Sequence, residues 1–364
     1  MLHVVFDARS VTDHYPGIGR YGSGLTHALA QRADVRLTLL VDPDAANTFH
    51  SLPDVERIAA PYRLSGLRQQ WAVPALVRQL APDVYHSPYY LMPYRMPCPV
   101  VVTFYDLIPL LVAGAHSLRF RLVYRLTHRL AAAAARRMIA ISHATAADLI
   151  RCLGFPAEKI TAIALGVGAE FRPSAVEGIA ALQRRHALPE AYALYVGTNK
   201  PHKNLPRLVE AWALADPPET LVVAGREDPR YPSAADLAAQ SGARVLALGE
   251  VSAKDLPILY AAAQFFVFPS LYEGFGLPAL EAMASGTPVV CADTSSLPEV
   301  AGDAALLADP RDVSSLGNAI ARLSADAPLR ADLRARGLAR AAEHTWERTA
   351  AETVAVYERC AAEK

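Results

Sequence analysis

The chain has 364 residues and no net formal charge, with 52% hydrophobic and 20% charged residues. This is the composition of a globular protein and excludes a disordered or fibrous chain. The length exceeds the usual size of one hydrophobic core, so we expect two domains. Residues 1–170 carry 17 Lys and Arg against 12 Asp and Glu, a net charge of +5, and the remainder carries 19 against 24, a net charge of −5. The N-terminal half is therefore basic, which bears on its partners.

Targeting and redox signals are weak. Residues 1–7 predict a short strand that ends in a charge, too short for a secretory signal. No window of about 18 uncharged apolar residues predicts a membrane-spanning helix. Four cysteines are widely spaced without a C-x-x-C motif, which predicts neither a zinc site nor a disulfide framework. We therefore expect a cytoplasmic protein without a bound metal.

Short apolar strands alternate with helical stretches in both halves, the pattern of βαβ units and parallel sheets. Strands are predicted at 2–6, 35–41, 83–86, 100–104 and 138–141, and then at 192–197, 220–224, 244–248, 265–268 and 288–291. Helices are predicted at 20–32, 204–215, 252–262, 312–323 and 345–362. The pattern breaks near 166–178. The predicted fold class is α/β with two Rossmann-like domains.

Glycines and polar residues follow several strands of the first half. Gly17 and Gly19 lie between the first strand and the next helix, although a tight turn there needs glycine in any case. His86 and Asp106 end two strands, where open α/β folds bind ligands. A histidine such as His86 is equally compatible with a structural role.

The stretch between Asp106 and Asp148 contains no acidic residue and six arginines: Arg119, Arg121, Arg125, Arg129, Arg136 and Arg137. Leu118, Phe120, Val123 and Tyr124 are interleaved with them. One interpretation is a surface helix with a packed apolar face, and the other is peripheral docking on an anionic membrane. Nucleic acid is not expected, because the sequence has no recognisable binding module and no net positive charge.

Two segments of the second half favour a phosphorylated ligand. Three basic residues, Lys200, His202 and Lys203, lie where helix 204–215 begins. Positive charge at a helix N-terminus is unfavourable because of the helix dipole, and a bound diphosphate would offset this repulsion. The alternative for Lys203 is a solvated surface lysine. Residues 265–284 read as strand, glycine loop and helix, with Glu273 in the loop and Glu281 in the first helical turn. Glycines and a helix N-terminus suit a phosphate, and carboxylates suit sugar or ribose hydroxyls. The segment therefore predicts a sugar-nucleotide site.

The two glutamates, separated by seven residues around Gly-Phe-Gly-Leu-Pro, resemble the E-x7-E motif of retaining glycosyltransferases of family 4. The resemblance continues through Val289-Val290, Pro298-Glu299-Val300 and Gly302-Asp303-Ala304. It spans nearly the full chain and is strongest over 192–310. It implies the GT-B architecture of two facing Rossmann-like domains with an interdomain cleft. The implied parts are an acceptor domain at 1–170, a donor domain at 171–344, and a final helix at 345–364 that packs back on the first domain.

The resemblance also implies site residues. Lys203 would bind the donor diphosphate, Glu281 the ribose and Glu273 a hydroxyl of the donor sugar, with Asp106 and His86 beside the transferred sugar. The implied donor contacts are Gly17, Gly19, Thr198, Lys203, Arg226, Val251, Gly274, Phe275, Gly276, Leu277 and Glu281. Two positions depart from the family pattern. Thr198 stands where an arginine is frequent, leaving Lys200 or His202 as substitutes, and Tyr105 stands where histidine is common.

The implied activity is transfer of a hexose from a nucleotide sugar to a glycan or polyprenyl-linked saccharide, by same-face attack and without a cofactor. The sequence resembles bacterial polysaccharide mannosyltransferases, which suggests GDP-mannose as donor, with a UDP-sugar as the alternative. Two other functions stay open: a GT-B nucleotide-sugar epimerase, and an inactive GT-B scaffold. The presence of Glu273, Glu281 and Lys203 argues against the scaffold.

Overall fold

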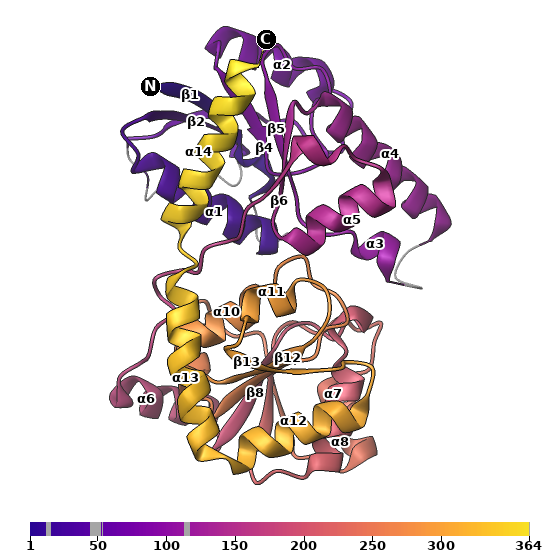
Figure 1. Cartoon of the computed structure of the whole chain (residues 1–364), viewed down its shortest axis with the longest axis vertical. Coiled ribbons are helices and arrows are strands. Elements are labelled where there is room, and N and C mark those ends of the chain that lie inside the picture. Colours follow the sequence, from indigo (N-terminus) through magenta and orange to yellow (C-terminus); the bar gives the residue numbers. More distant parts are fainter. Residues whose placement is uncertain (12–15, 44–51, 53, 113–116, 364) are drawn as a thin grey trace. The chain divides into compact units, whose positions relative to one another are not determined.

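The computed structural model describes residues 1–11, 16–43, 52, 54–112 and 117–363. The chain divides into two compact units (Figure 1). Unit 1 comprises Met1–Gly166 together with Thr345–Lys364, and unit 2 comprises Val167–His344. Each unit is built around its own parallel sheet.

Unit 1 contains a seven-stranded sheet in the order β3-β2-β1-β4-β5-β6-β7, with every pairing parallel. Its strands are β1 (Leu2–Asp7), β2 (Val35–Val41), β3 (Glu56–Ala59), β4 (Val84–Ser87), β5 (Val100–Phe104), β6 (Arg137–Ala140) and β7 (Ile160–Ala162). The strand order reverses between β1 and β4. Open sheets of this kind bind ligands at the carboxyl ends of the strands beside such a reversal.

Helices cover both faces of this sheet. They are α1 (Pro16–Ala30), α2 (Gln69–Leu80), α3 (Ile108–Leu111), α4 (Leu118–Ala134), α5 (His143–Leu153) and α14 (Trp346–Ala362). Short 3-10 turns occur at Ala8–Ser10 and Ala157–Lys159. The core on one face joins side chains of α2, α4 and α5 to alternate strand residues such as Tyr85. Since side chains alternate across a strand, His86 points to the opposite face, where it meets α1 and α14.

Unit 2 contains a six-stranded parallel sheet in the order β10-β9-β8-β11-β12-β13. Its strands are β8 (Tyr192–Val196), β9 (Thr220–Ala224), β10 (Val245–Gly249), β11 (Phe265–Phe268), β12 (Val289–Ala292) and β13 (Ala305–Ala308). Its helices are α6 (Val176–His186), α7 (Leu205–Ala215), α8 (Ala234–Ser241), α9 (Leu256–Ala262), α10 (Leu277–Ala284), α11 (Leu297–Ala301), α12 (Val313–Ala325) and α13 (Ala327–Ala342), with a 3-10 turn, η4, at Pro201–Lys203. Here the order reverses between β8 and β11.

The predicted α/β class with two Rossmann-like domains is confirmed. The predicted strands are present, and three strands were missed: β3, β7 and β13. All three lie at the edge of a sheet. All three are only three or four residues long and are less buried than the strands beside them, so their signal in the sequence is weak. β3 illustrates this with Glu56 and Arg57 exposed in four residues.

The C-terminal helix α14 belongs to unit 1. It packs against α1 and against strands β4, β5 and β6. Arg136 Nη1 donates a hydrogen bond to Cys360 O at 3.1 Å, and the Arg137 guanidinium forms an ion pair with Glu363. No helix in the described part of the chain is long and apolar enough to cross a membrane.

Candidate active site

The reversal point of unit 2 brings together a lysine and a glutamate that are 70 residues apart in sequence. Lys203 follows β8 and Glu273 follows β11. Lys203 Nζ donates a hydrogen bond to Glu273 Oε1 at 2.6 Å, and only 17% and 11% of the two side chains are exposed. Nζ also lies 5.1 Å from the centroid of the Phe268 ring. Both residues were predicted for the donor site, and the structure adds a direct ion pair between them.

Asn204 holds the lysine loop in place. Its φ of 61° ends the 3-10 turn Pro201–Lys203 and begins α7. Asn204 Nδ2 donates to Pro269 O at 3.1 Å and to Pro310 O at 2.6 Å, and Leu271 N donates to His202 O at 2.7 Å. These bonds connect the loop after β8 to the loops after β11 and β13. Lys203 is therefore positioned by the Asn204 side chain and by a backbone bond between the two loops at the sheet reversal.

The glycine loop at 270–276 is fixed by serines from the loop after β12. Ser295 Oγ accepts from Glu273 N at 3.0 Å, and Ser296 Oγ donates to Glu273 O at 3.0 Å and to Phe275 O at 2.6 Å. Gly276 has φ of 114°, and a Cβ there would lie 2.6 Å from Leu297 Cδ2. Glycine is therefore required at this position by conformation and by space.

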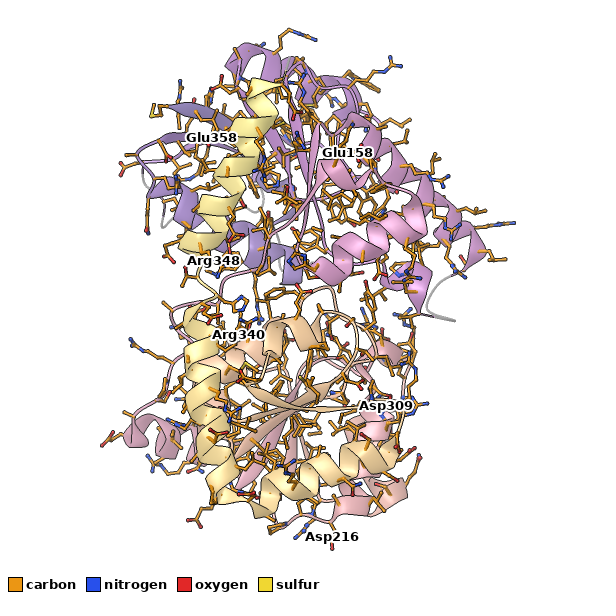
Figure 2. The ribbon with its side chains drawn as sticks, viewed as in Figure 1. Glu158, Asp216, Asp309, Arg340, Arg348 and Glu358 are labelled. Atoms are coloured by element: carbon orange, nitrogen blue, oxygen red, sulfur yellow. The ribbon has the colours of Figure 1, made fainter. Side chains whose placement is uncertain are left out.

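Arg340 of α13, labelled in Figure 2, contacts α11. Its Nε donates to Val300 O at 3.0 Å and its Nη2 donates to Glu299 O at 2.7 Å. Cations stabilise the carbonyl end of a helix, so this arginine anchors the segment that carries Ser295 and Ser296.

The N-terminus of α10 faces the same loop. Its N-cap residue is Gly276, which has no side chain to cap the first turn, and Pro278 occupies a position where an N–H group would have no helical partner. Gly274, Phe275 and Gly276 are buried, and Leu277 is the first helical residue. A helix N-terminus with a lysine from the adjacent loop is suited to bind an anion.

Glu281 lies elsewhere than predicted. The sequence placed it in the first turn of the helix, but α10 begins at Leu277 and Glu281 falls in the second turn. The difference arises because Gly276, with its positive φ, is the residue before the helix. Glu281 is 2% exposed, and its Oε2 accepts a hydrogen bond from Tyr260 Oη at 3.1 Å. The contact between Glu281 and the ribose stays a prediction, and the Glu281 carboxylate has little surface accessible to a ligand.

The loops after β8, β9 and β10 run side by side. Gly197 N donates to Ala224 O at 2.9 Å, and Gly225 N donates to Gly249 O at 2.7 Å. A Cβ on Gly225 would lie 2.2 Å from Gly197 O, so side chains are excluded from this backbone contact. Exposed Arg226 and half-buried Val251 follow directly. Backbone groups dominate this edge, where the resemblance implied donor contacts at Arg226 and Val251.

Asn199 connects neighbouring loops in this region, while Thr198 bonds within its own segment. Asn199 is buried, and its Nδ2 donates to the carbonyls of Asp228, Tyr231 and Pro232 at 3.1, 3.2 and 3.1 Å. At Thr198, where the family pattern has an arginine, the carbonyl accepts from the buried Tyr195 hydroxyl at 2.8 Å. Asn199 was missed by the sequence analysis, since a polar side chain in a loop gives no sign of burial.

Gly17 and Gly19 lie in the first turn of α1, not in a loop before it as predicted. The helix begins at Pro16, because proline is favoured in the first turn, where its missing N–H has no cost. Gly17 is exposed, and a Cβ built on it would meet no atom within 4 Å. Packing within unit 1 therefore does not explain the glycine at position 17.

His86 lies inside unit 1. It is fully buried, and hydrogen bonds link its Nδ1 to Tyr357 Oη at 2.5 Å and its Nε2 to Thr103 Oγ1 at 2.8 Å. Thr103 Oγ1 in turn lies 2.8 Å from Tyr21 Oη. Burial lowers the pKa of His86 to about 3. This network corrects the catalytic expectation, because a buried histidine bonded through both ring nitrogens acts as a structural link between β4, α1 and α14.

Tyr105 and Asp106 follow β5 at the carboxyl edge of the sheet. Asp106 is half-buried, with Oδ1 accepting from Ile108 N at 3.0 Å and its carbonyl accepting from Tyr124 Oη at 2.8 Å. The Tyr105 hydroxyl is buried and has no hydrogen-bond partner in the described structure. Burial raises the pKa of Tyr105 well above its ordinary value, so the hydroxyl stays a donor. A buried donor without a partner is costly and invites a ligand explanation.

A buried ion pair at the end of β1 was also missed. The Asp7 carboxylate accepts from Arg9 Nε at 2.7 Å, from Arg9 Nη2 at 2.5 Å and from Tyr85 Oη at 2.5 Å. Arg9 Nη2 also donates to Gln69 Oε1 at 3.2 Å. All four residues are buried. The charge that ends the first strand was its only sign in the sequence.

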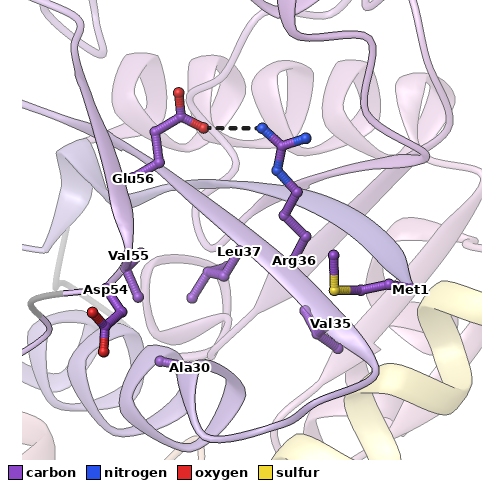
Figure 3. A pocket seen from close by; sticks show the side chains of 8 residues that line it. All are labelled: Met1, Ala30, Val35, Arg36, Leu37, Asp54, Val55 and Glu56. Atoms are coloured by element: carbon purple, nitrogen blue, oxygen red, sulfur yellow. Dashed lines mark ion pairs between the residues drawn. The ribbon is translucent and has the colours of Figure 1, made fainter.

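A pocket of about 260 Å³ lies at the amino ends of β1, β2 and β3 (Figure 3). Arg36 and Glu56 form an ion pair of 3.5 Å at its border. This edge is opposite the one where parallel sheets bind ligands, and none of the predicted site residues lines it. Among the described residues, no group of three or more His, Cys, Asp or Glu could hold a metal ion.

The comparisons with known proteins agree with this geometry. Residues 181–340 match the family described as "Glycosyl transferases group 1", and residues 15–171 match "Glycosyltransferase Family 4". The sequence is 32% identical to O-antigen chain mannosyltransferase B of Escherichia coli, over 98% of this chain and 99% of that protein. It is 31% identical to the serotype-specific mannosyltransferase WbdA of Escherichia coli, over 70% of this chain and 33% of that protein.

Among solved structures, the fold is similar to HepE of Anabaena in complex with UDP and glucose, with a TM-score of 0.78, 21% identity, and coverage of 98% of this chain and 100% of that one. The two parallel-sheet units therefore define a glycosyltransferase of the GT-B class. The chain belongs to glycosyltransferase family 4, as the spacing of Glu273 and Glu281 predicted.

Proposed function

We propose that this protein is a retaining mannosyltransferase that transfers mannose from GDP-mannose to a saccharide or polyprenyl-linked glycan acceptor in the cytoplasm. The observation that carries the proposal is the Lys203–Glu273 ion pair of 2.6 Å at the sheet reversal, next to the α10 N-terminus. Mannose as the sugar is supported by the full-length similarity to an O-antigen mannosyltransferase. Since HepE is only 21% identical, its UDP supports no choice of donor base here.

The ion pair suits the charge changes of glycosyl transfer. The transition state resembles an oxocarbenium ion, and negative charge builds on the departing diphosphate. Lys203 and the backbone N–H groups around Gly274–Leu277 would stabilise that charge. Glu273 would accept a hydrogen bond from a hydroxyl of the donor sugar. The nucleotide would extend over the adjoining backbone at Thr198, Arg226 and Val251.

Both site carboxylates, Glu273 and Glu281, make interactions that do not leave them placed as nucleophiles. Glu273 pairs with Lys203, and Glu281 is buried against Tyr260. This supports same-face attack, in which the acceptor hydroxyl bonds to the anomeric carbon as the carbon–oxygen bond to the diphosphate breaks. The departing phosphate oxygen then takes the proton of the acceptor hydroxyl. No cofactor is needed for this balance.

In unit 1, we assign saccharide recognition to the Tyr105 hydroxyl and the Asp106 side chain. Both follow β5 at the carboxyl edge of the sheet. The exposed Gly17 in the first turn of α1 would allow close approach of a ligand to the helix N-terminus. Gly19 would share this role as the second small residue of that turn.

The test is a donor panel with product analysis. The full chain is incubated with GDP-mannose or UDP-glucose, with and without a polyprenyl-linked saccharide, and the anomeric configuration of the product is determined by NMR. We expect mannose transfer with retained configuration from GDP-mannose. Rearranged donor in the absence of acceptor would establish the epimerase instead, and no turnover of any donor would favour the scaffold.

A matched pair of lysine variants tests the site itself. Lys203→Ala should lower kcat/KM by an amount equivalent to about 2–4 kcal/mol, the usual effect of removing one stabilising donor. Lys254→Ala, at an exposed position of the same unit, is the control and should keep wild-type activity. Equal activities of the two variants would contradict the diphosphate role.

A further inference from the structure

Helix α4 is apolar on the side that faces away from unit 1. Its buried side presents Tyr124, His128, Ala131 and Ala132 to the core. Five aliphatic side chains on the rest of the helix are exposed: Leu118 by 75%, Leu122 by 68%, Val123 by 59%, Leu126 by 58% and Leu130 by 40%. At 100° per residue, these five group on one face, opposite the buried one. An amphipathic helix of a monomeric domain carries polar residues there, so this face is unusual.

The same face is basic. Arg119, Arg125 and Arg129 are exposed beside the aliphatic residues, and the sequence has no Asp or Glu from 107 to 147. The other three arginines of this stretch have contacts within unit 1. Arg121 Nη2 donates to Leu110 O at 3.1 Å, while Arg136 and Arg137 contact the end of α14. The charge available to a partner is therefore half of what the sequence suggested.

We propose that the outward face of α4, consisting of Leu118, Leu122, Leu126, Arg125 and Arg129 with their neighbours, docks on an anionic lipid bilayer. Aliphatic side chains of a helix lying in the interface enter the acyl boundary, and arginines reach the lipid phosphates. The face supplies both groups along a helix of 17 residues, about 26 Å long. The proposal that this face binds lipid depends only on the geometry of α4. The further idea that a polyprenyl-linked acceptor is presented there rests on the proposed function.

Charge complementarity favours the bilayer over other occupants. A second copy packed face to face on α4 would bring arginines against arginines, with no acidic residue on the helix to neutralise them. A nucleic acid would pair with the arginines but leave five aliphatic side chains in water. An anionic bilayer satisfies the aliphatic and the cationic groups together.

Vesicle co-sedimentation of the full chain tests the proposal without donor or acceptor, so its outcome is independent of catalysis. The vesicles contain phosphatidylcholine alone or mixed equally with phosphatidylglycerol. We expect binding to the mixed vesicles that weakens with added salt. Leu122→Gln and Leu126→Gln should each reduce partitioning by roughly tenfold, equivalent to about 1.4 kcal/mol, because each removes an aliphatic side chain that would be buried in the bilayer. Arg125→Gln with Arg129→Gln should remove the preference for the anionic lipid.

The control is Leu214→Gln, at a leucine of unit 2 that is 62% exposed, and it should bind like wild type. All substituted side chains are exposed, so folding should survive, and circular dichroism checks this. Absence of wild-type binding to either vesicle overturns the proposal. A dimer in solution that Leu126→Gln dissociates overturns it in favour of a second copy. Binding to an RNA homopolymer that is unaffected by the leucine variants overturns it in favour of a polyanion.

Discussion

Replacement of Lys203 by methionine should reveal the stability contribution of the ion pair in unit 2. Methionine keeps the aliphatic bulk near Phe268 but leaves the Glu273 carboxylate without its cation. Removing one partner costs about 3–5 kcal/mol when a pair is fully buried and about 0–1 kcal/mol when it is exposed. With 17% and 11% of the side chains exposed, the pair lies between these limits. We expect a loss of about 2 kcal/mol.

Calorimetry of the full chain measures this loss. A loss of about 2 kcal/mol should lower the melting temperature of unit 2 by roughly 4–8 °C, given the usual values for domains of 150–250 residues. Glu273→Gln should cost less, because the lysine side chain can reach solvent. The double variant Lys203→Met with Glu273→Gln should recover part of the loss, which a double-mutant cycle quantifies. If Lys203→Met melts with wild type, the ion pair contributes nothing in solution and the reasoning is refuted.

The same pair makes a further prediction about ligand affinity. If Lys203 binds the donor diphosphate as proposed, Glu273 would compete with the diphosphate for Lys203 and repel it. Glu273→Gln should therefore bind free GDP more tightly than wild type while its kcat falls, because the sugar contact is lost. Titration calorimetry and steady-state kinetics check both signs. Weaker GDP binding by Glu273→Gln would mean that the carboxylate contacts the nucleotide instead of the sugar.

Burial holds the pKa of His86 and His128 at about 3. As the pH falls, the unfolded chain, in which the histidine pKa is near 6.5, therefore takes up protons before the folded chain does. The stability that the two neutral histidines allow unit 1 is present above about pH 6.5, and each histidine should cost about 2 kcal/mol between pH 7 and pH 5. Urea unfolding at the two pH values measures this, and an unchanged midpoint for unit 1 would contradict it. Tyr105→Phe should stabilise unit 1 by about 1 kcal/mol, because it removes a buried donor that has no partner in the described structure. It should also lower kcat/KM if the Tyr105 hydroxyl binds the saccharide, and wild-type kinetics would reject this contact. Gly17→Ala and the control Gly178→Ala should each gain up to about 1 kcal/mol of helix stability. Only Gly17→Ala should lose activity, and equal activities of the two variants would remove Gly17 from the proposed site.

The sequence was sufficient for those parts of the fold that depend on local patterns. Buried parallel strands such as β11 are continuous apolar runs, so they were found with correct bounds. The loop chemistry around Glu273 was also recognisable, because glycines, a proline and two glutamates stand at fixed spacings. The local backbone conformation was not predicted. The positive φ of Gly276 moves the start of α10, so Glu281 lies in the second turn and not in the first.

Long-range pairing could not be predicted in the same way. Nothing near Lys203 indicates a partner 70 residues later, because the sheet reversal alone brings them together. His86 was assigned by its place at a strand end, but its side chain points to the face covered by α14, where Tyr357 binds it. Arg136 and Arg137 were counted as surface charges, yet they contact the C-terminal end of α14. In each case, a distant element decides the role of the residue.

The discontinuity of unit 1 has a consequence for the order of folding. Unit 2 is one continuous segment, Val167–His344, whereas unit 1 also needs α14, which follows unit 2 in the sequence. Until α14 docks, His86 lacks its Tyr357 partner, and the sheet face that receives Val356 and Cys360 stays open to water. A nascent chain should therefore complete unit 2 first and expose an unfinished apolar surface on unit 1, which makes the earlier half of the sequence the later half to fold.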